Sequence, residues 1–336
     1  MSHLYLGIFM DGETLRLALI SRGLRETRLV DCLRLEGFHE RSQPELQKEI
    51  GAFLGKNKAV GCRSVLVLPR SEFIVRKLEL PVAAQVNLSK VVEYQLASLL
   101  PSEEAAICYD FFVPKAGKDA KAMGVTVFVL LKSVVEAKLR TCESAGLKIE
   151  RVVPSSAVLA SCFESLPQRV RKPTLLFCYA VGPHCELASF AGGLLQQVQE
   201  LPCSSEEELL EALQRETKVF RSQAQVPEEA PVDAFLFSPV HRIWERETQD
   251  RLLKFHAISN LVQLGLSRGK TTLDAQEVKD DFLPVMAALT SFKRRNPYAI
   301  NLLPPEKRVE KSRWASVPVY VLLGINLIFL LALSLR

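Results

Sequence analysis

The order of hydrophobic and polar patterns along the chain occurs twice. In each copy, three short apolar or alternating runs are separated by turn residues, and an amphipathic helical pattern and another apolar run follow. The turns fall at Asp11-Gly12 and Arg22-Gly23 in the first copy, and at Gly182-Pro183 and Gly192-Gly193 in the second. Each copy therefore predicts a three-stranded meander, a crossover helix and a strand parallel to the meander's first strand.

The predicted elements occupy corresponding places in the two copies. The first copy predicts strands at 5–9, 14–21, 24–35 and 64–69 and a helix at 44–54. The second predicts strands at 174–179, 186–190, 194–201 and 234–238 and a helix at 205–221, which opens with a serine cap and an acidic first turn. Because a duplicated α/β unit forms two similar lobes, we expect the two-lobed fold of the actin-like (RNase H-like duplicated) ATPases.

A segment with a different pattern, residues 72–148, interrupts the first copy. It predicts strands at 73–80, 107–113 and 125–132 and helices at 88–100 and 133–145. This order predicts a small α/β subdomain inserted into the first lobe, which comprises residues 1–71 and 149–172. The second lobe is then expected at 173–295.

The last apolar run, residues 314–335, contains 22 residues and no charged side chain. As a helix it would be roughly 30 Å long, close to the thickness of a bilayer's hydrocarbon core. A buried core helix is the alternative, but the length favours a transmembrane helix. Basic residues precede the run at Lys307, Arg308, Lys311 and Arg313, so the positive-inside rule predicts a cytoplasmic body and a C-terminus on the opposite side.

Essentially the whole chain resembles known families, and two of its parts contain the motifs of this resemblance. The sequence RKLELP at 76–81, VVEYQL at 91–96 and YDF at 109–111 resembles the small subdomain that PilM-like proteins of type IV pili and GspL-like proteins of type II secretion share with the cell-division protein FtsA. Near the predicted span, Ile300-Asn301-Leu302-Leu303-Pro304 is similar to the short motif at the start of PilN. In that family the motif docks into a groove of PilM just before the membrane span of PilN.

The resemblance implies that residues 300–304 are a partner-docking motif within a juxtamembrane linker, residues 296–313. An extended peptide with apolar side chains for pockets and Asn301 for backbone hydrogen bonds suits recognition by strand addition or groove insertion. The alternative is a simple apolar linker strand that ends at Pro304-Pro305.

The families imply a function and a location. They imply a scaffold of the bacterial inner membrane that links a cytoplasmic secretion or pilus-assembly ATPase, and other platform proteins, to a single-pass span with a periplasmic C-terminus. Homo-oligomers or hetero-oligomers are expected. The sequence does not decide between a pilus and a secretion system.

The resemblance also places the phosphate loops of an actin-like nucleotide site on the chain. Such a site needs an acidic residue near the end of the first strand of each lobe, because carboxylates hold the water shell of Mg²⁺ and position the attacking water. Phe9 and Ala180 occupy these positions. Asp11, Gly12 and Gly182 are the remnants of a cofactor site for ATP, although the chemistry of two tight turns also explains them.

Besides Phe9 and Ala180, the chain departs from an actin-like nucleotide site after the strand at 234–238. There Ser238-Pro239-Val240 replaces the glycine pair expected on the adenosine side of the site. These departures from an actin-like nucleotide site predict a protein that does not hydrolyse ATP and has no catalytic residue. They leave open that the protein binds ATP without hydrolysing it. The alternative function is a membrane-tethered actin-like ATPase or kinase that still binds nucleotide. A cytoskeletal tether closer to FtsA would instead carry an amphipathic terminal helix.

The composition of the chain excludes further classes of function. The formal net charge of +5 is concentrated before the apolar run, which indicates a membrane-proximal collar and no nucleic-acid surface. The eight cysteines form no CxxC pair, so we expect free thiols in a reducing compartment. Cys178, His184 and Cys185 lie close in sequence but have no fourth ligand nearby, so no metal site is predicted.

Overall fold

The structure is a computed structural model of the chain. It describes residues 3–12, 14–23, 26–97, 106–113, 121–166, 174–181, 184–192, 194–201, 203–227, 230–238, 253–258, 261–264, 276–293 and 296–308. The chain divides into two compact units, Met1–Pro304 and Pro305–Arg336. In the second unit the structure describes a short 3-10 turn, η6 (Pro305–Lys307).

The first lobe contains a five-stranded sheet in the order β3-β2-β1-β4-β8. Its strands are β1 (His3–Asp11), β2 (Thr14–Arg22), β3 (Thr27–Leu35), β4 (Arg63–Leu68) and β8 (Arg151–Pro154). The first three pair antiparallel, whereas β4 and β8 join parallel. The crossover to β4 is α1 (Gln43–Lys56), and the Glu45 carboxylate at its start accepts hydrogen bonds from the Ser42 N–H and hydroxyl.

The second lobe repeats this topology in a sheet of order β11-β10-β9-β12-β13. Its elements are β9 (Leu175–Val181), β10 (His184–Ala191), β11 (Leu194–Glu200), α5 (Glu206–Gln223), β12 (Val232–Phe237) and β13 (Leu253–Ala257). The Ser205 hydroxyl caps α5 by accepting the Glu208 N–H at 3.2 Å. In both sheets the first strand of the meander pairs parallel with the strand after the crossover helix, which confirms the predicted duplication.

The inserted segment forms a three-stranded antiparallel sheet of order β5-β7-β6. Its elements are η1 (Arg70–Glu72), β5 (Ile74–Pro81), η2 (Val82–Asn87), α2 (Leu88–Ala97), β6 (Ile107–Phe112), β7 (Ala122–Leu131) and α3 (Lys132–Ser144). Val92 and Leu96 of α2 form a separate small core with one face of this sheet. The apolar side chains of α3 join the main core instead.

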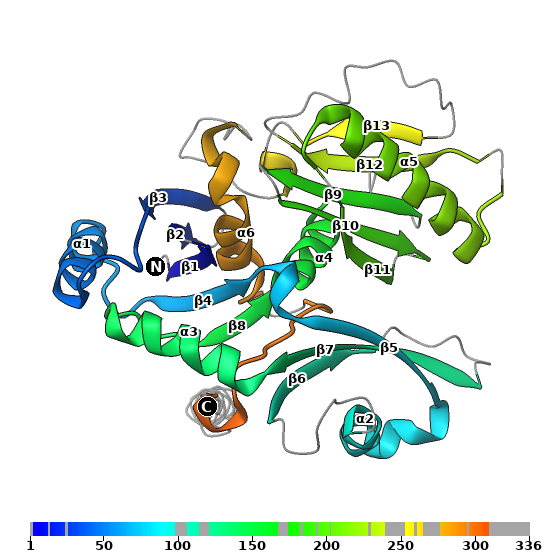
Figure 1. Cartoon of the computed structure of the whole chain (residues 1–336), viewed down its shortest axis with the longest axis horizontal. Coiled ribbons are helices and arrows are strands. Elements are labelled where there is room, and N and C mark those ends of the chain that lie inside the picture. The colour runs from blue at the N-terminus through cyan, green and yellow to red at the C-terminus, as the bar shows by residue number, and fades with distance from the viewer. Residues whose placement is uncertain are drawn as a thin grey trace, which may run out of the picture. The chain divides into compact units, whose positions relative to one another are not determined.

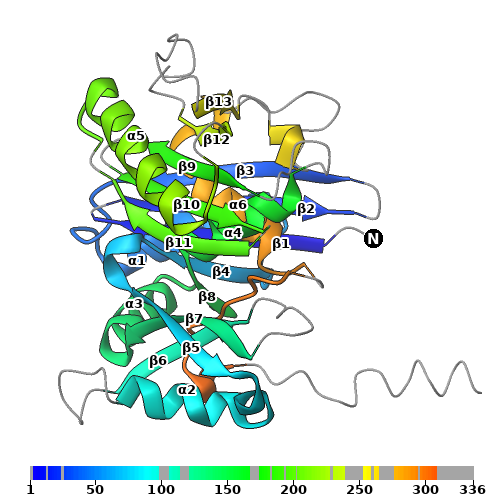
Figure 2. The same cartoon turned by 90° about the vertical axis from the view of Figure 1, so that its right-hand side faces the viewer.

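Two helices lie between the five-stranded sheets, α4 (Ser155–Ser165) and α6 (Phe282–Thr290) (Figure 1). The helix α6 packs on β1, β2 and β4, and α4 packs on β9 and β10. Figure 2 shows α5 on the outer side of the second sheet, away from α4 and α6. A Cβ atom on Gly7 would lie 1.8 Å from the Pro284 carbonyl oxygen, so only glycine permits this approach of α6 to β1.

The structure confirms the predicted strands and helices of both copies and of the insert, within a few residues at each end. It also contains β13 and α6, which the sequence pattern did not predict. The predicted second lobe, 173–295, includes α6, yet this helix packs directly on the first sheet. All nine residues of α6 are buried, and a helix that is apolar all round shows no helical periodicity.

The predicted transmembrane run, residues 314–335, lies outside the described residues. Among the residues that the structure does describe, no helix combines the length and the apolar character needed to cross a membrane.

Candidate functional site

Residues 296–304, here called the strap, follow α6 and run along the edge strand β8 and past β6 (Figure 1). The Leu302 N–H donates to the Val152 carbonyl oxygen at 2.7 Å, and the Val152 N–H donates to Asn301 Oδ1 at 3.0 Å. In the described part of the chain, β8 is the last strand of its sheet. The strap therefore pairs with peptide groups at an edge that a further strand would otherwise occupy.

Asn301 holds the strap to two different sheets. Its Oδ1 accepts both the Val152 N–H and, at 3.2 Å, the Leu303 N–H. Its backbone N–H donates to Asp110 Oδ2 on β6 at 2.7 Å. One residue thus links the edge of the first sheet to the inserted sheet.

The apolar residues of the predicted docking motif are buried in the main core. The exposed fraction is 2% for Ile300, 0% for Leu302 and 1% for Leu303. Full burial of such a side chain contributes about 1.5–3 kcal/mol relative to exposure. Pro304 is buried as well and is the last residue of the first compact unit. The five predicted residues therefore contact the body of their own chain.

The N-terminal half of the strap contacts the inserted sheet, the second lobe and α4. The Tyr298 ring packs edge-on against Phe112 of β6, with centroids 4.9 Å apart, and its hydroxyl accepts the Leu195 N–H of β11 at 3.2 Å. Asn296 Nδ2 donates to the Ser161 hydroxyl of α4 at 2.9 Å. Together with Asn301, these residues bring one continuous peptide into contact with all three sheets.

The positions expected to carry the acids of a nucleotide site are part of the hydrophobic core. Phe9 is 2% exposed, and Ala180 is completely buried. Next to Ala180, the Tyr179 ring stacks on the rings of Phe237 and Phe282. The Phe237 and Phe282 rings also stack on each other, with centroids 3.8 Å apart. These aromatic side chains fill the space between the C-terminal ends of the central strands of the two lobes.

The remaining space beside Phe9 is small. Phe9, Tyr179, Leu283 and Glu186 line a cavity of about 20 Å³, which is room for one water molecule. Ligand sites for molecules the size of a nucleotide are usually hundreds of cubic ångströms. The cavity in this arrangement of the lobes is therefore far too small for ATP.

The predicted remnants of the site have separate structural roles. Asp11 ends β1, pairs with Thr14 across the turn, and lies 3.6 Å from the Arg16 guanidinium. Gly12 has a φ of 52°, in the left-handed region that favours glycine, so the turn itself accounts for it. Gly182 lies outside the described residues. Ser238 is buried, and Pro239 and Val240 also lie outside the described residues.

A buried carboxylate joins the two lobes near this cavity. Glu186 of β10 accepts a hydrogen bond from the Ser156 hydroxyl at the start of α4. Burial raises the pKa of Glu186 to about 6, and the Ser156 hydroxyl and the Arg70 guanidinium oppose this rise. No local sequence signal identifies this group, because an isolated buried glutamate in a strand pattern is indistinguishable from a solvent-facing one.

The sequence predicts no metal site at Cys178, His184 and Cys185, although they lie close together in the chain. The two thiols lie 3.6 Å apart, and the side chain of His184 is outside the described set. Across the described residues, no group of three or more His, Cys, Asp or Glu side chains is arranged to hold a metal ion. The hydrogen bond with the Cys178 thiol and burial raise the pKa of Cys185, whereas the Cys203 thiol opposes this rise, and the net rise keeps Cys185 protonated.

Val152, Asp110 and Tyr298 are functional candidates that sequence reasoning missed. Asp110 lies within the YDF segment that carried a family resemblance, but the sequence assigned it no role. Val152 contributes only its peptide group, and any residue type except proline would supply that. The edge position of β8 follows from the topology of the whole lobe, so no local signal could have identified it.

No protein-family model and no curated protein sequence matches the chain. Among solved structures, the chain is similar to the PilM-PilN type IV pilus biogenesis complex, with 14% identity, 84% of this chain and 97% of the other covered, and a TM-score of 0.61. It is also similar to the cytoplasmic domain of EpsL, an inner-membrane component of the type II secretion system of Vibrio cholerae, with 16% identity, 78% and 92% covered, and a TM-score of 0.48. A protein of Bacteroides thetaiotaomicron with an actin-like ATPase fold follows, with 11% identity, 70% and 81% covered, and a TM-score of 0.41. The first likeness confirms the resemblance to PilM-like proteins at the level of the fold, and with it the mixed α/β, actin-like architecture.

Proposed function

We propose that this chain is an assembly-platform scaffold of a type IV pilus or type II secretion system, anchored in the bacterial inner membrane by residues 314–335. The strap carries this proposal. A segment similar to the docking motif of PilN pairs with β8 and with Asp110 on a body that has the fold of the PilM-PilN structure. In this chain the docking peptide and the body that receives it are parts of one molecule.

The covalent connection between the strap and the body explains how such a short contact can stay formed. A peptide joined to its own groove by a short connection has an effective concentration on the order of millimolar, so even a weak contact is occupied most of the time. The strap would thereby fix the body at the membrane surface. In this role the body recruits a cytoplasmic secretion or pilus-assembly ATPase, together with other platform proteins of the membrane.

The scaffold role in this proposal involves no hydrolysis of ATP. It is supported by the buried positions of Phe9 and Ala180, and by the aromatic side chains between the lobes. Binding of Mg-ATP to the native state would stabilise it, by about 2.7 kcal/mol at a concentration one hundred times the Kd. We therefore expect an unchanged melting temperature at millimolar Mg-ATP, and a clear rise would favour the ATPase or kinase alternative.

Purification of the full chain from membranes tests the proposal directly. The wild-type chain, cross-linked in cells and extracted in mild detergent, is expected to bring down an assembly ATPase and further platform proteins, identified by mass spectrometry. The double variant Leu302→Asp, Leu303→Asp is the test of the strap, and Val60→Asp, Val86→Asp is its control, since these two side chains are 77% and 87% exposed. Loss of partners from the first variant alone supports the scaffold. Recovery of no pilus or secretion component with the wild-type chain contradicts it.

A further inference from the structure

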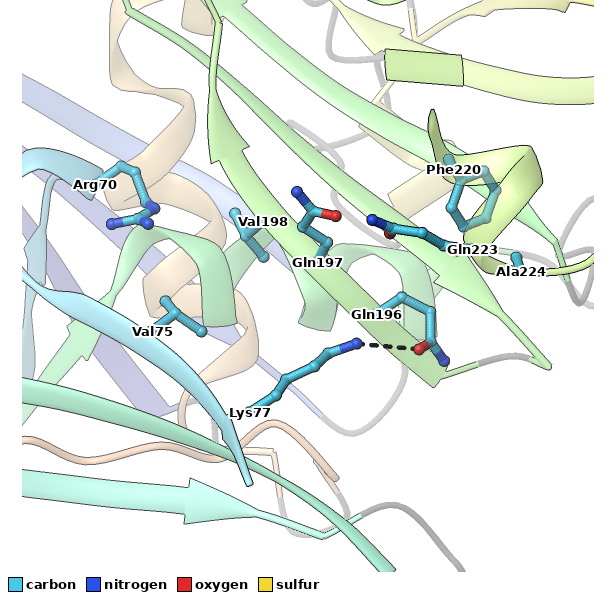
Figure 3. A pocket seen from close by; sticks show the side chains of 9 residues that line it. All are labelled: Arg70, Val75, Lys77, Gln196, Gln197, Val198, Phe220, Gln223 and Ala224. Atoms are coloured by element: carbon cyan, nitrogen blue, oxygen red, sulfur yellow. Dashed lines mark hydrogen bonds between the residues drawn. The ribbon is translucent and has the colours of Figure 1, made fainter. Parts of the chain in front are cut away.

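A groove of about 530 Å³ lies between β5 of the inserted subdomain and β11 of the second lobe (Figure 3). Arg70 and Lys77 form one wall, Gln196 and Gln197 belong to β11, and Gln223 and Phe220 come from the end of α5. Its volume is within the range of about 300–1,000 Å³ that ligand sites occupy. The groove is distinct from the strap and from the cavity beside Phe9.

The charge of this groove is positive. Arg70 and Lys77 line it, and none of the described residues that form its walls is an aspartate or glutamate. Lys77 Nζ donates to Gln196 Oε1 at 3.2 Å, which is a neutral partner, and burial lowers the pKa of this lysine. Arg70 Nη1 donates to the Phe73 carbonyl oxygen, whereas its buried Nε has no hydrogen-bond partner among the described residues. Arg70 also lines the neighbouring cavity, where it interacts with the Glu186 carboxylate, and neither Glu186 nor Glu200 of that cavity lines the groove.

The walls also suit the backbone of an extended peptide. In the described part of the chain, β5 and β11 are each the last strand of their sheets. Alternate peptide groups of an edge strand point away from its sheet and can pair with an added strand. At the start of β11 one of these groups is already used, because the Leu195 N–H donates to the Tyr298 hydroxyl of the strap. The groove begins at the next residue, Gln196.

The polar side chains are spread along the groove. Figure 3 shows Arg70 near one end, Gln223 and Phe220 near the other, and Lys77 reaching across to Gln196 between them. Three glutamine amides line it as well: Gln196 bonds to Lys77 and to the Ala191 carbonyl oxygen, Gln197 Nε2 donates to Gln199, and Gln223 lies at the end of α5. A compact phosphorylated molecule is usually held by cations that converge on one point, whereas this distribution fits a chain with several anionic groups.

We propose that this groove binds an extended acidic segment of a partner protein, which adds to the edge of β11 and directs its carboxylates toward Lys77 and Arg70. Backbone pairing would supply affinity, and the two cations would select acidic side chains. The inference rests on the groove alone and does not depend on the proposed function.

A labelled peptide tests the proposal. The probe is a fluorescein-labelled octapeptide of alternating glutamate and valine, and its anisotropy is measured against the full wild-type chain in mild detergent. We expect saturable binding that weakens as salt is added, because the charges are partly exposed. Lys77→Glu should weaken binding about tenfold or more, since it places a like charge opposite the peptide. Arg76→Glu makes the same change in net charge at the neighbouring residue of β5, which does not line the groove, and should bind as the wild type does.

Three results would overturn the proposal. One is the absence of binding by the octapeptide at millimolar protein. Another is an equal loss with Lys77→Glu and Arg76→Glu, which would indicate general attraction to a basic surface. The third is a rise in melting temperature with pyrophosphate or citrate that Lys77→Glu removes, without binding of the peptide, which would assign the groove to a small anion. A peptide of alternating lysine and valine is the control for charge and should not bind.

Discussion

Asn301 Oδ1 accepts one of the two hydrogen bonds that join the strap to Val152 at the edge of the first lobe, so Asn301→Ala is the most specific test of that contact. The substitution removes the acceptor of the Val152 and Leu303 N–H groups, which lie at 3.0 and 3.2 Å. It leaves the buried side chains of Leu302 and Leu303 unchanged. The perturbation therefore loosens the pairing with β8 without creating a cavity in the core.

The size of the effect follows from the two donors that lose their acceptor. An unpaired buried donor costs about 1–3 kcal/mol, and because Asn301 is only half-buried, we expect about 2 kcal/mol for the pair together. One factor of ten in an equilibrium corresponds to about 1.36 kcal/mol. Local opening of the strap should therefore become roughly 30-fold more frequent.

Hydrogen exchange followed by mass spectrometry measures this opening in the full chain. Exchange should rise in the fragments that contain Val152 and residues 300–304, while fragments from α5 remain unchanged. Asn57→Ala is the matched control, because that amide is also half-buried and bonds to Asp31 and the Phe53 carbonyl oxygen at a distant site. Unchanged exchange at Val152 in Asn301→Ala, or an equal rise throughout the chain, would refute the reasoning.

Two further predictions concern the space between the lobes. Burial raises the pKa of Glu186 from 4.5 to about 6, so the folded state favours the protonated carboxyl, and about 2 kcal/mol of stability is present below pH 4.5 and lost as pH rises through 6. Glu186→Gln should remove this loss, seen as a smaller fall in melting temperature between pH 4.5 and 7 than in the wild type. Gly7→Ala should destabilise the protein by about 3 kcal/mol or more in urea unfolding, because its methyl group would overlap the Pro284 carbonyl group, whereas Gly51→Ala, on the exposed side of α1, should stabilise it by about 0.5–1 kcal/mol. Equal effects of the two alanines would show that α6 does not constrain β1.

The sequence was sufficient where local chemistry sets the structure. The start of α5 is an example, because Ser205 and the acidic first turn act within a few residues of one another. The two meanders were predictable for the same reason, since glycine at the turns and apolar runs between them define hairpins without reference to the rest of the chain. The motif at residues 300–304 was recognisable as an extended segment with buried apolar side chains.

The sequence was insufficient where the contacts are distant along the chain. Phe282 and its neighbours form a helix because two sheets surround them, and an apolar run of this length with Pro284 near its start also fits a strand or a loop. The hydrogen bond of Asn301 to Asp110 joins residues 191 positions apart. Their proximity depends on the placement of the inserted sheet beside β8, which no local pattern specifies.

The contacts of the strap follow one another along the chain, and this order gives them a mechanical meaning. A pull on the chain beyond Pro304 loads the contacts of Leu303, Leu302 and Asn301 with β8 and Asp110 first. Only after these separate does the force reach Tyr298, whose hydroxyl accepts the Leu195 N–H of the second lobe, and last the contact of Asn296 with α4. Tension would thus detach the strap from β8 and Asp110 while Tyr298 still ties it to Phe112 of the inserted subdomain and to the second lobe, so a graded force produces an ordered sequence of states.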